Sequence, residues 1–213
     1  MQLKSDYFLL PYLLILFILL PVQILYDQVN ISLLVNSFHT SFLDQLCKYG
    51  THLGDGVFVV VICLILLTYN PRLASTILVS YLLSAGLAQF LKHVVFSHTM
   101  RPLAIIQQLN INPIHLVEGV NMNFQNSFPS GHTASSFAFF TALSFFTNSP
   151  YKKILFLFIG LFVAFTRIYL LQHFLIDTYI GSIIGCFTSI LVYYYLIRKN
   201  GYEWVLNKFK RNG

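Results

Sequence analysis

The sequence predicts an all-α integral membrane protein with six transmembrane helices and a short amphipathic helical segment on the periplasmic side. Only 9% of its residues are charged, whereas a soluble domain carries about 25%. Hydrophobic residues make up 56% of the chain and gather in six runs whose apolar character suits membrane-spanning helices. Because six spans use most of the 213 residues, we expect a single membrane-embedded domain over residues 1–213.

The six apolar runs are separated by breaks that contain Asn, Pro and Lys. They cover approximately residues 8–25, 53–69, 73–96, 132–146, 154–171 and 174–197. No small-residue cleavage site follows the first run, so we interpret it as a retained helix rather than a signal peptide. The fourth run is short and rich in Ser, which favours a position inside the helix bundle.

Two segments outside these runs are more polar. Residues 28–50 carry hydrophobic side chains at roughly helical spacing, which is typical of an amphipathic helix lying at the membrane interface. Residues 97–128 form a polar connection rich in Asn and Gln, and loops of this length are usually functional or disordered. At the start of the second run, we interpret His52 and Asp55 as residues that cap or top the helix, with a part in the chemistry as the alternative.

The distribution of Lys and Arg predicts the orientation in the membrane. Six spans place both termini on one side, and this side carries Lys4, Arg72, Lys152, Lys153, Arg198, Lys199, Lys208, Lys210 and Arg211. The opposite side carries Lys48, Lys92, Arg101 and Arg167. Since cytoplasmic loops are enriched in Lys and Arg, we expect cytoplasmic termini and place the opposite side of the protein outside. The net charge of +6 follows from this distribution and does not indicate a nucleic-acid partner.

The segment from 166 to 177 carries three functional groups in apolar surroundings. His173 and Asp177 are four residues apart, so on a helix they share one face. A carboxylate there can accept the N–H of the imidazole and leave the other ring nitrogen free to attack, as in nucleophilic catalysis. Arg167 adds a positive charge suited to a phosphate. The alternative interpretation is a helix boundary with a snorkelling Arg and a capping Asp.

Two further segments fall on the same predicted side of the membrane. Lys92 and Arg101-Pro102 lie around the end of the third run, within residues 92–102. Residues 129–133 contain Pro129-Ser130-Gly131-His132, which is typical of a turn into a helix, and a helix N-terminus binds anions. Taken singly, each group also has a structural interpretation. Lys92 would anchor the helix end at the membrane surface, residues 129–131 would form an ordinary turn, and His132 would be a hydrogen-bonded structural residue. Their common side favours one anion-binding site.

These three motifs resemble the signature of the type 2 phosphatidic acid phosphatase superfamily, which also includes vanadium-dependent haloperoxidases. The family pattern is Lys, six residues, Arg-Pro, then Pro-Ser-Gly-His, then Ser-Arg, five residues, His, three residues, Asp. The second part is intact at 129–132, and the third matches at its Arg, His and Asp with Thr166 in place of Ser. The first part departs from the pattern because eight residues separate Lys92 from Arg101.

The resemblance implies a lipid phosphatase that needs no metal or other cofactor. By analogy, His173 attacks phosphorus and becomes a phosphohistidine, Asp177 orients it, and His132 protonates the leaving alkoxide. The resemblance also implies that the transition state is stabilised by Lys92, Arg101, Ser130, Gly131 and Arg167. The expected substrate is a phosphorylated membrane lipid, with lipid A 4'-phosphate favoured over undecaprenyl diphosphate, phosphatidylglycerophosphate and phosphatidate.

Two other classes of function compete with this interpretation. A zinc hydrolase could use His132, His173 and Asp177 as ligands, although Arg167 nearby would repel a dication. A protein without catalytic activity, either an inactive relative or a lipid carrier, would also place ionisable residues within a membrane.

Overall fold

The computed structural model describes residues 6–198, and within this range the regular structure is entirely helical. The helices in chain order are α1 (Asp6–Leu25), α2 (Gln28–Ser37), α3 (Ser41–Gly50), η1 (Thr51–Gly54), α4 (Gly56–Tyr69), α5 (Pro71–Phe90), η2 (Leu91–Val95), α6 (Pro102–Gln108), α7 (Gly131–Phe145), α8 (Pro150–Tyr169), α9 (Leu175–Tyr193) and η3 (Tyr194–Arg198). The element η1 is a 3₁₀-helix, whereas η2 and η3 are π-helical turns. The all-α prediction is therefore confirmed for the described part of the chain.

Each of the six apolar runs forms a helix, namely α1, α4, α5, α7, α8 or α9. By length and composition, three described segments can cross a membrane: 7–25, 71–95 and 175–197. The count rises to four if 41–54 and 56–69, which meet at a bend of 58°, form one span. The six predicted segments are thus helical, and the crossing of the membrane by all six stays a prediction. Lys4, Lys199, Lys208, Lys210 and Arg211 lie outside the described residues.

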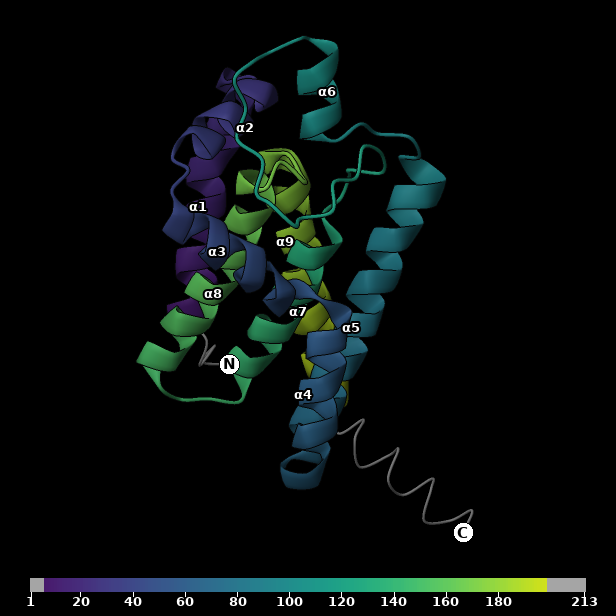
Figure 1. The fold of residues 1–213 in the computed structure, drawn as a ribbon. Helices are drawn as coiled ribbons and strands as arrows, with labels where there is room; N and C mark the ends of the chain where they lie inside the picture. The colour runs from purple at the N-terminus through teal and green to yellow at the C-terminus, as the bar shows by residue number, and fades with distance from the viewer. Residues whose placement is uncertain (1–5, 199–213) are drawn as a thin grey trace.

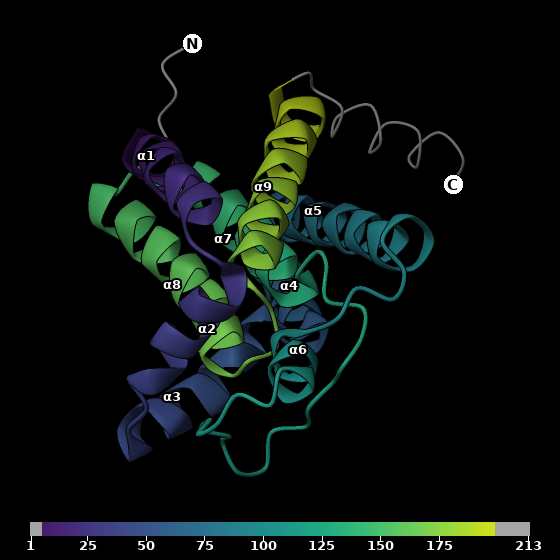
Figure 2. The same cartoon turned by 90° about the horizontal axis from the view of Figure 1, so that it is seen from above.

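The helix α7 forms the centre of the bundle. It packs against α9, α5 and α8, and the view along the bundle shows it enclosed by its neighbours (Figure 2). Most of its side chains are buried, including Ser135, Ser136, Thr141 and Ser144. The expectation that this short, Ser-rich run lies inside the bundle is confirmed. Its 15 residues span only about 22 Å at 1.5 Å per residue, which is less than the hydrocarbon thickness of a bilayer.

Two glycines allow α9 to approach α7 closely. A Cβ atom on Gly181 would lie 2.6 Å from the Ser130 carbonyl oxygen, and one on Gly185 would lie 2.2 Å from that of Ala134. Both contacts are with backbone atoms, which cannot move aside as a flexible side chain can. Small residues at such crossings are how membrane helices bring their backbones together. The contact fixes the start of α9 beside the start of α7.

The loops and short helices divide between the two ends of the bundle (Figure 1). The α4–α5 and α7–α8 connections lie at one end, whereas α2, α6 and the long connection after α6 lie at the other. Two expectations need correction here. Residues 28–50 form two helices rather than one, because Asp27 caps α2 and Thr40 caps α3. Residues 97–128 are not wholly loop, because Pro102 at the first turn starts the short helix α6.

The long connection is tied to the helical body by polar contacts. Nε2 of His115 donates to the carboxylate of Asp44 at 2.9 Å, and the Tyr169 hydroxyl donates to the same carboxylate at 2.5 Å. The Asn36 side chain donates to the carbonyl of His115 at 2.9 Å and accepts from its N–H at 3.0 Å. The segment around His115 is therefore fixed against α2, α3 and the end of α8.

The close approach of α9 to α7 predicts an unequal response to two glycine substitutions. Gly185→Ala forces the backbones apart, and overpacking of this kind costs about 1–3 kcal/mol. Gly86→Ala on α5 is the control, because a Cβ there meets no atom within 4 Å and alanine favours a helix interior. We expect thermal unfolding in detergent to show a lower midpoint for Gly185→Ala and no loss for Gly86→Ala. Equal midpoints would contradict the close contact.

Candidate functional site

A cavity of about 280 Å³ opens between α4, α5 and α7. Five of the residues singled out from the sequence line it: Lys92, Arg101, Gly131, His132 and Arg167. These residues come from η2, the start of α6, the start of α7 and the end of α8. The three motifs, which are far apart along the chain, therefore meet at one place.

Lys92 reaches this cavity despite its irregular distance from Arg101 along the sequence. It lies in the π-helical turn η2, which contains more residues per turn than an α-helix. After η2, the chain reverses at His98, whose φ of 67° is in the left-handed region. Together these local features accommodate the longer spacing, and the Lys92 side chain is 9% exposed at the cavity.

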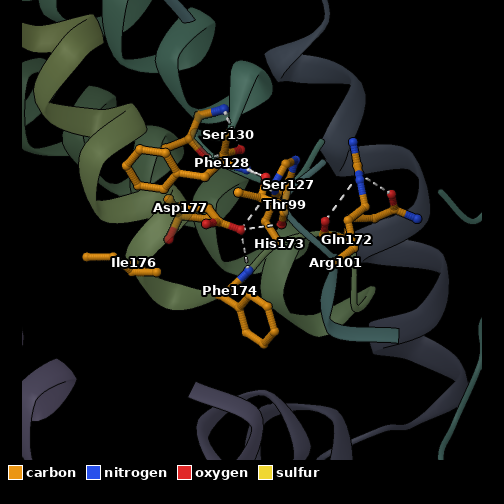
Figure 3. Close-up of polar contacts among 12 residues, drawn as sticks. Thr99, Arg101, Ser127, Phe128, Ser130, Gln172, His173, Phe174, Ile176 and Asp177 are labelled. Carbon is orange, nitrogen blue, oxygen red and sulfur yellow. Dashed lines mark hydrogen bonds and ion pairs between the residues drawn. The ribbon is translucent and has the colours of Figure 1, made fainter. Parts of the chain in front are cut away.

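Arg101 is held by oxygen atoms that carry no formal charge (Figure 3). Its Nε donates to the Gln125 carbonyl at 2.9 Å, and one terminal nitrogen donates to the Gln172 side chain at 2.8 Å and to the Gln172 carbonyl at 3.2 Å. Burial lowers the pKa of Arg101 below its usual range, yet a guanidinium stays protonated at neutral pH. Its charge is thus available to an anion in the cavity.

Arg167 is also positioned by a neutral oxygen. One terminal nitrogen donates to the Thr51 hydroxyl at 2.7 Å, which connects α8 to η1. Its Nε is buried and has no hydrogen-bond partner. A buried donor without a partner is costly, and an oxygen of a bound anion could satisfy it.

The start of α7 is organised by Ser130. Its Oγ accepts hydrogen bonds from the Thr133 hydroxyl at 3.0 Å and from the Thr133 N–H at 3.4 Å, so Ser130 caps the helix. Its own N–H donates to the carbonyl of Asp177 at 3.0 Å. A Cβ on the next residue, Gly131, would meet no atom within 4 Å. The helix N-terminus therefore presents open space, where an anion can approach the backbone.

His173 and Asp177 lie buried beside the cavity, with 1% and 2% of their surface exposed. Nδ1 of His173 lies 3.4 Å from Oδ2 of Asp177 and has no hydrogen-bond partner. The same oxygen accepts from the Phe174 N–H at 2.9 Å and from the Ser127 hydroxyl at 2.5 Å (Figure 3). Asp177 therefore caps α9 and faces His173 at once, so both interpretations of this residue apply.

The environment of His173 favours its neutral form. Burial, reinforced by the nearby positive charges of Arg167 and Arg101, lowers the pKa of His173 well below its usual 6.5. A neutral imidazole has a free ring nitrogen, whereas an imidazolium has none. Near neutral pH, His173 therefore has the lone pair that a nucleophile needs.

The side chain of Asp55 makes two contacts that the sequence did not predict. Asp55 occupies the N-cap position of α4, but its side chain makes no capping hydrogen bond. Its carboxylate instead contacts Nε2 of His132 at 2.6 Å and Nδ1 of His52 at 2.5 Å. Asp55 therefore lies at the top of the helix, as predicted, but its carboxylate contacts two imidazoles instead of capping the helix N–H groups. Glycines on both sides of Asp55 were the available signal of unusual backbone packing.

The ligand set of the alternative zinc site is not assembled in this structure. Among residues 6–198, no three His, Cys, Asp or Glu side chains group in a way that could hold a metal ion. His132 pairs with Asp55 rather than with His173 and Asp177. The three predicted zinc ligands thus belong to two separate histidine–carboxylate pairs.

Comparison with known proteins gives one family and two similar structures. The model of the PAP2 superfamily matches residues 72–201. No curated protein matches the chain. The crystal structure of Aquifex aeolicus LpxE is similar with a TM-score of 0.68 and 23% identity, over 79% of this chain and 95% of that one. A transmembrane PAP2 type phosphatidylglycerolphosphate phosphatase from Bacillus subtilis gives 0.63 and 20%, over 89% and 94%.

The cationic cavity predicts binding of inorganic phosphate. We expect Lys92→Ala and Arg167→Ala each to weaken phosphate binding roughly 10- to 100-fold, as expected for a lost charged hydrogen bond. Lys48→Ala is the control, because Lys48 donates to the Glu118 carbonyl and does not line the cavity. Isothermal titration calorimetry in detergent measures the three affinities. Unchanged binding in Lys92→Ala would place that side chain outside the phosphate site.

Proposed function

Because this chain belongs to the PAP2 superfamily, we propose that it is an integral membrane lipid phosphatase that works through a phosphohistidine. The observation that carries the proposal is the single cavity that unites Lys92, Arg101, Arg167 and His132 beside the buried His173. Three cations and an imidazole suit a phosphate better than any neutral ligand. We assign this activity to one membrane-embedded domain.

The first step forms the phosphoenzyme. The free ring nitrogen of His173 attacks phosphorus, a P–N bond forms, and the P–O bond to the lipid breaks. The proton of His132 passes to the leaving oxygen, which departs as an alcohol. Asp177 faces Nδ1 of His173 and stabilises the positive charge that develops on this ring as it attacks.

The second step restores the enzyme. His132, now neutral, takes a proton from water, and the water oxygen attacks phosphorus. The P–N bond breaks and inorganic phosphate leaves, while both imidazoles return to their starting states. In each step the charge on the equatorial oxygens is met by Lys92, Arg101 and Arg167, with the hydroxyl of Ser130 and the backbone N–H of Gly131. These are the side chains and the helix start that border the cavity.

This chemistry uses no metal ion or other cofactor. The cations of the cavity supply the charge that a metal would supply in a metal-dependent phosphatase. Activity is therefore expected to persist in a chelator. Loss of activity in a chelator, restored by a divalent metal, would count against this part of the proposal.

A second cavity supports a choice of substrate. It has a volume of about 530 Å³ and shares Gln89, Lys92, Arg101 and Asn123 with the first. Gln125 and Asn126 also line it, so four amide side chains surround the approach to the cations. Amides both donate and accept hydrogen bonds, as sugar hydroxyls do. We therefore favour a phosphorylated sugar head group, such as lipid A 4'-phosphate, over undecaprenyl diphosphate, phosphatidylglycerophosphate or phosphatidate.

The distribution of charge supports a periplasmic site. Arg72 and Lys152 lie at the end of the bundle opposite to the long connection, at the starts of α5 and α8. With cytoplasmic loops positive, this end faces the cytoplasm of a bacterial inner membrane. The cavity then opens toward lipids of the outer leaflet.

His173→Ala tests the catalytic proposal. We expect it to lose phosphate release because no other nitrogen occupies the position of the nucleophile. His39→Ala is the control, since His39 stacks on His115 and does not line the cavity. Alkaline quenching followed by intact-mass spectrometry should detect a phosphorylated wild-type chain and none in His173→Ala. Normal turnover by His173→Ala would refute the proposal, and a wild-type protein that releases no phosphate would favour an inactive relative or a carrier.

Asn123→Leu tests the proposed head group. If Asn123 binds sugar hydroxyls, the substitution should lower kcat/KM for lipid A roughly 10-fold or more and leave kcat/KM for phosphatidate within a few-fold. Phosphate release from the two lipids in mixed micelles provides the comparison. Equal losses on both lipids would show that the amides do not select a sugar.

A further inference from the structure

We propose that Asp55 is a positioning residue that holds His132 in the orientation and protonation state of a general acid. This inference rests on the proposed phosphatase activity and adds a second histidine–carboxylate pair to the pair of His173 and Asp177. The contact between Nε2 of His132 and Oδ1 of Asp55 is 2.6 Å. At this distance a carboxylate and a protonated imidazole form a close ion pair.

The contact determines which ring nitrogen of His132 can act on the substrate. A carboxylate only accepts hydrogen bonds, so Nε2 of His132 carries the proton of the 2.6 Å contact. The proton that can be transferred is then the one on Nδ1. In the described part of the chain, Nδ1 has no hydrogen-bond partner from the protein. Asp55 thus leaves one nitrogen of His132 for the leaving oxygen.

The other oxygen of Asp55 is also fixed. Nδ1 of His52 lies 2.5 Å from Oδ2, and the side chain of His52 is 66% exposed, against 32% for Asp55. The carboxylate is therefore held between an outer imidazole and the imidazole at the cavity. A carboxylate with both oxygens engaged cannot rotate away from His132 without losing two charged contacts.

The backbone on both sides of Asp55 packs closely against His132 and Tyr81. A Cβ on Gly54 would lie 2.7 Å from the carbonyl oxygen of His132, and one on Gly56 would lie 1.9 Å from the hydroxyl of Tyr81. Larger residues at either position would push the turn between η1 and α4 away from α7. The two glycines therefore permit the close approach that brings Asp55 to His132.

The negative charge of Asp55 in a phosphate-binding cavity is compensated only when the adjacent imidazole of His132 is protonated. It is the one carboxylate among the described residues that line the cavity. Alone, it would repel a phosphate dianion, and it would weaken the attraction of the three cations. Paired with an imidazolium, it forms a neutral unit that still donates from Nδ1. The placement of an acid in a phosphate cavity is thus explained by its effect on His132.

Asp55 itself neither gains nor loses a proton in this scheme. During formation of the phosphoenzyme, the Nδ1 proton of His132 moves to the leaving oxygen as the P–O bond breaks. During hydrolysis, Nδ1 takes a proton from water as the P–N bond breaks. Throughout both steps the Nε2 proton stays between His132 and Asp55. The requirement for Asp55 is therefore greatest when the leaving group is a basic alkoxide.

The basicity of the leaving group provides the test. We would compare kcat/KM of Asp55→Asn for two substrates. The leaving group of dioctanoyl phosphatidic acid is a strongly basic alkoxide, whereas that of p-nitrophenyl phosphate is a weakly basic phenolate. We expect a loss of roughly 100-fold or more on the alkyl ester, within the range for general acids, and a loss of less than about 10-fold on the aryl ester. The inhibition constant of inorganic phosphate should stay equal or fall, because a negative charge is removed.

Matched variants separate positioning from folding. Asp44→Asn removes another carboxylate that pairs with a histidine, His115, away from the cavity, and it should leave the ratio of the two kcat/KM values unchanged. Asp55→Glu retains the charge and should recover part of the activity on the alkyl ester. Failure of the proposed function itself would appear differently, as retention of both activities in His173→Ala.

Three outcomes would overturn the inference. Equal losses of Asp55→Asn on the alkyl and aryl esters would assign Asp55 a general structural role. Loss of phosphate inhibition in both Asp55→Asn and Asp55→Glu would do the same, because the cavity itself would have been lost. Full activity of Asp55→Asn on the alkyl ester would show that His132 needs no carboxylate.

Discussion

The carboxylate and carbonyl of Asp177 join the segments on which the site depends. Its Oδ2 accepts from Ser127 in the long connection and from the backbone of Phe174, while it faces His173. Its carbonyl accepts from the N–H of Ser130, so α9 and α7 begin at a fixed distance from each other. The glycine contacts between these helices depend on the same approach. One residue thus sets the relative position of the two histidines.

The cavity shows how binding can oppose stability. Its two arginines are oriented by neutral groups, namely Gln125 and Gln172 at Arg101 and Thr51 at Arg167, and within residues 6–198 Nε of Arg167 has no hydrogen-bond partner. Burying three positive charges that make no direct salt bridge in the described part of the chain costs free energy, even with Asp55 and Asp177 nearby. A phosphate would offset that cost by accepting from the same donors. The arrangement of the cations therefore costs stability, as is common where function needs preorganised charge.

The sequence predicted the helices well because they rest on local signals. Apolar runs mark helices wherever the solvent is lipid. The expectation that His173 and Asp177 share one face of a helix was wrong, because His173 lies in the turn before Phe174, the N-cap of α9, and only Asp177 lies in the first turn of that helix. The role of Asp55 was not predictable, because its partner His132 lies 77 residues further along the chain. Ser127 and Gln172 were likewise missed, since polar loop residues carry no periodic signal. Helix α6 was not predicted because its seven residues are too few to show a helical period in hydrophobicity.

The π-helical turn at Lys92 has a consequence for how such proteins are identified. An α-helix that gains a residue usually rotates every later side chain by about 100°, whereas a π turn absorbs the insertion locally. Here the turn keeps the ammonium group at the cavity although the distance to Arg101 in the sequence has grown. A pattern with a rigid six-residue gap would reject this chain. The same pattern would miss homologues with similar insertions, whereas a comparison of three-dimensional structures would find them.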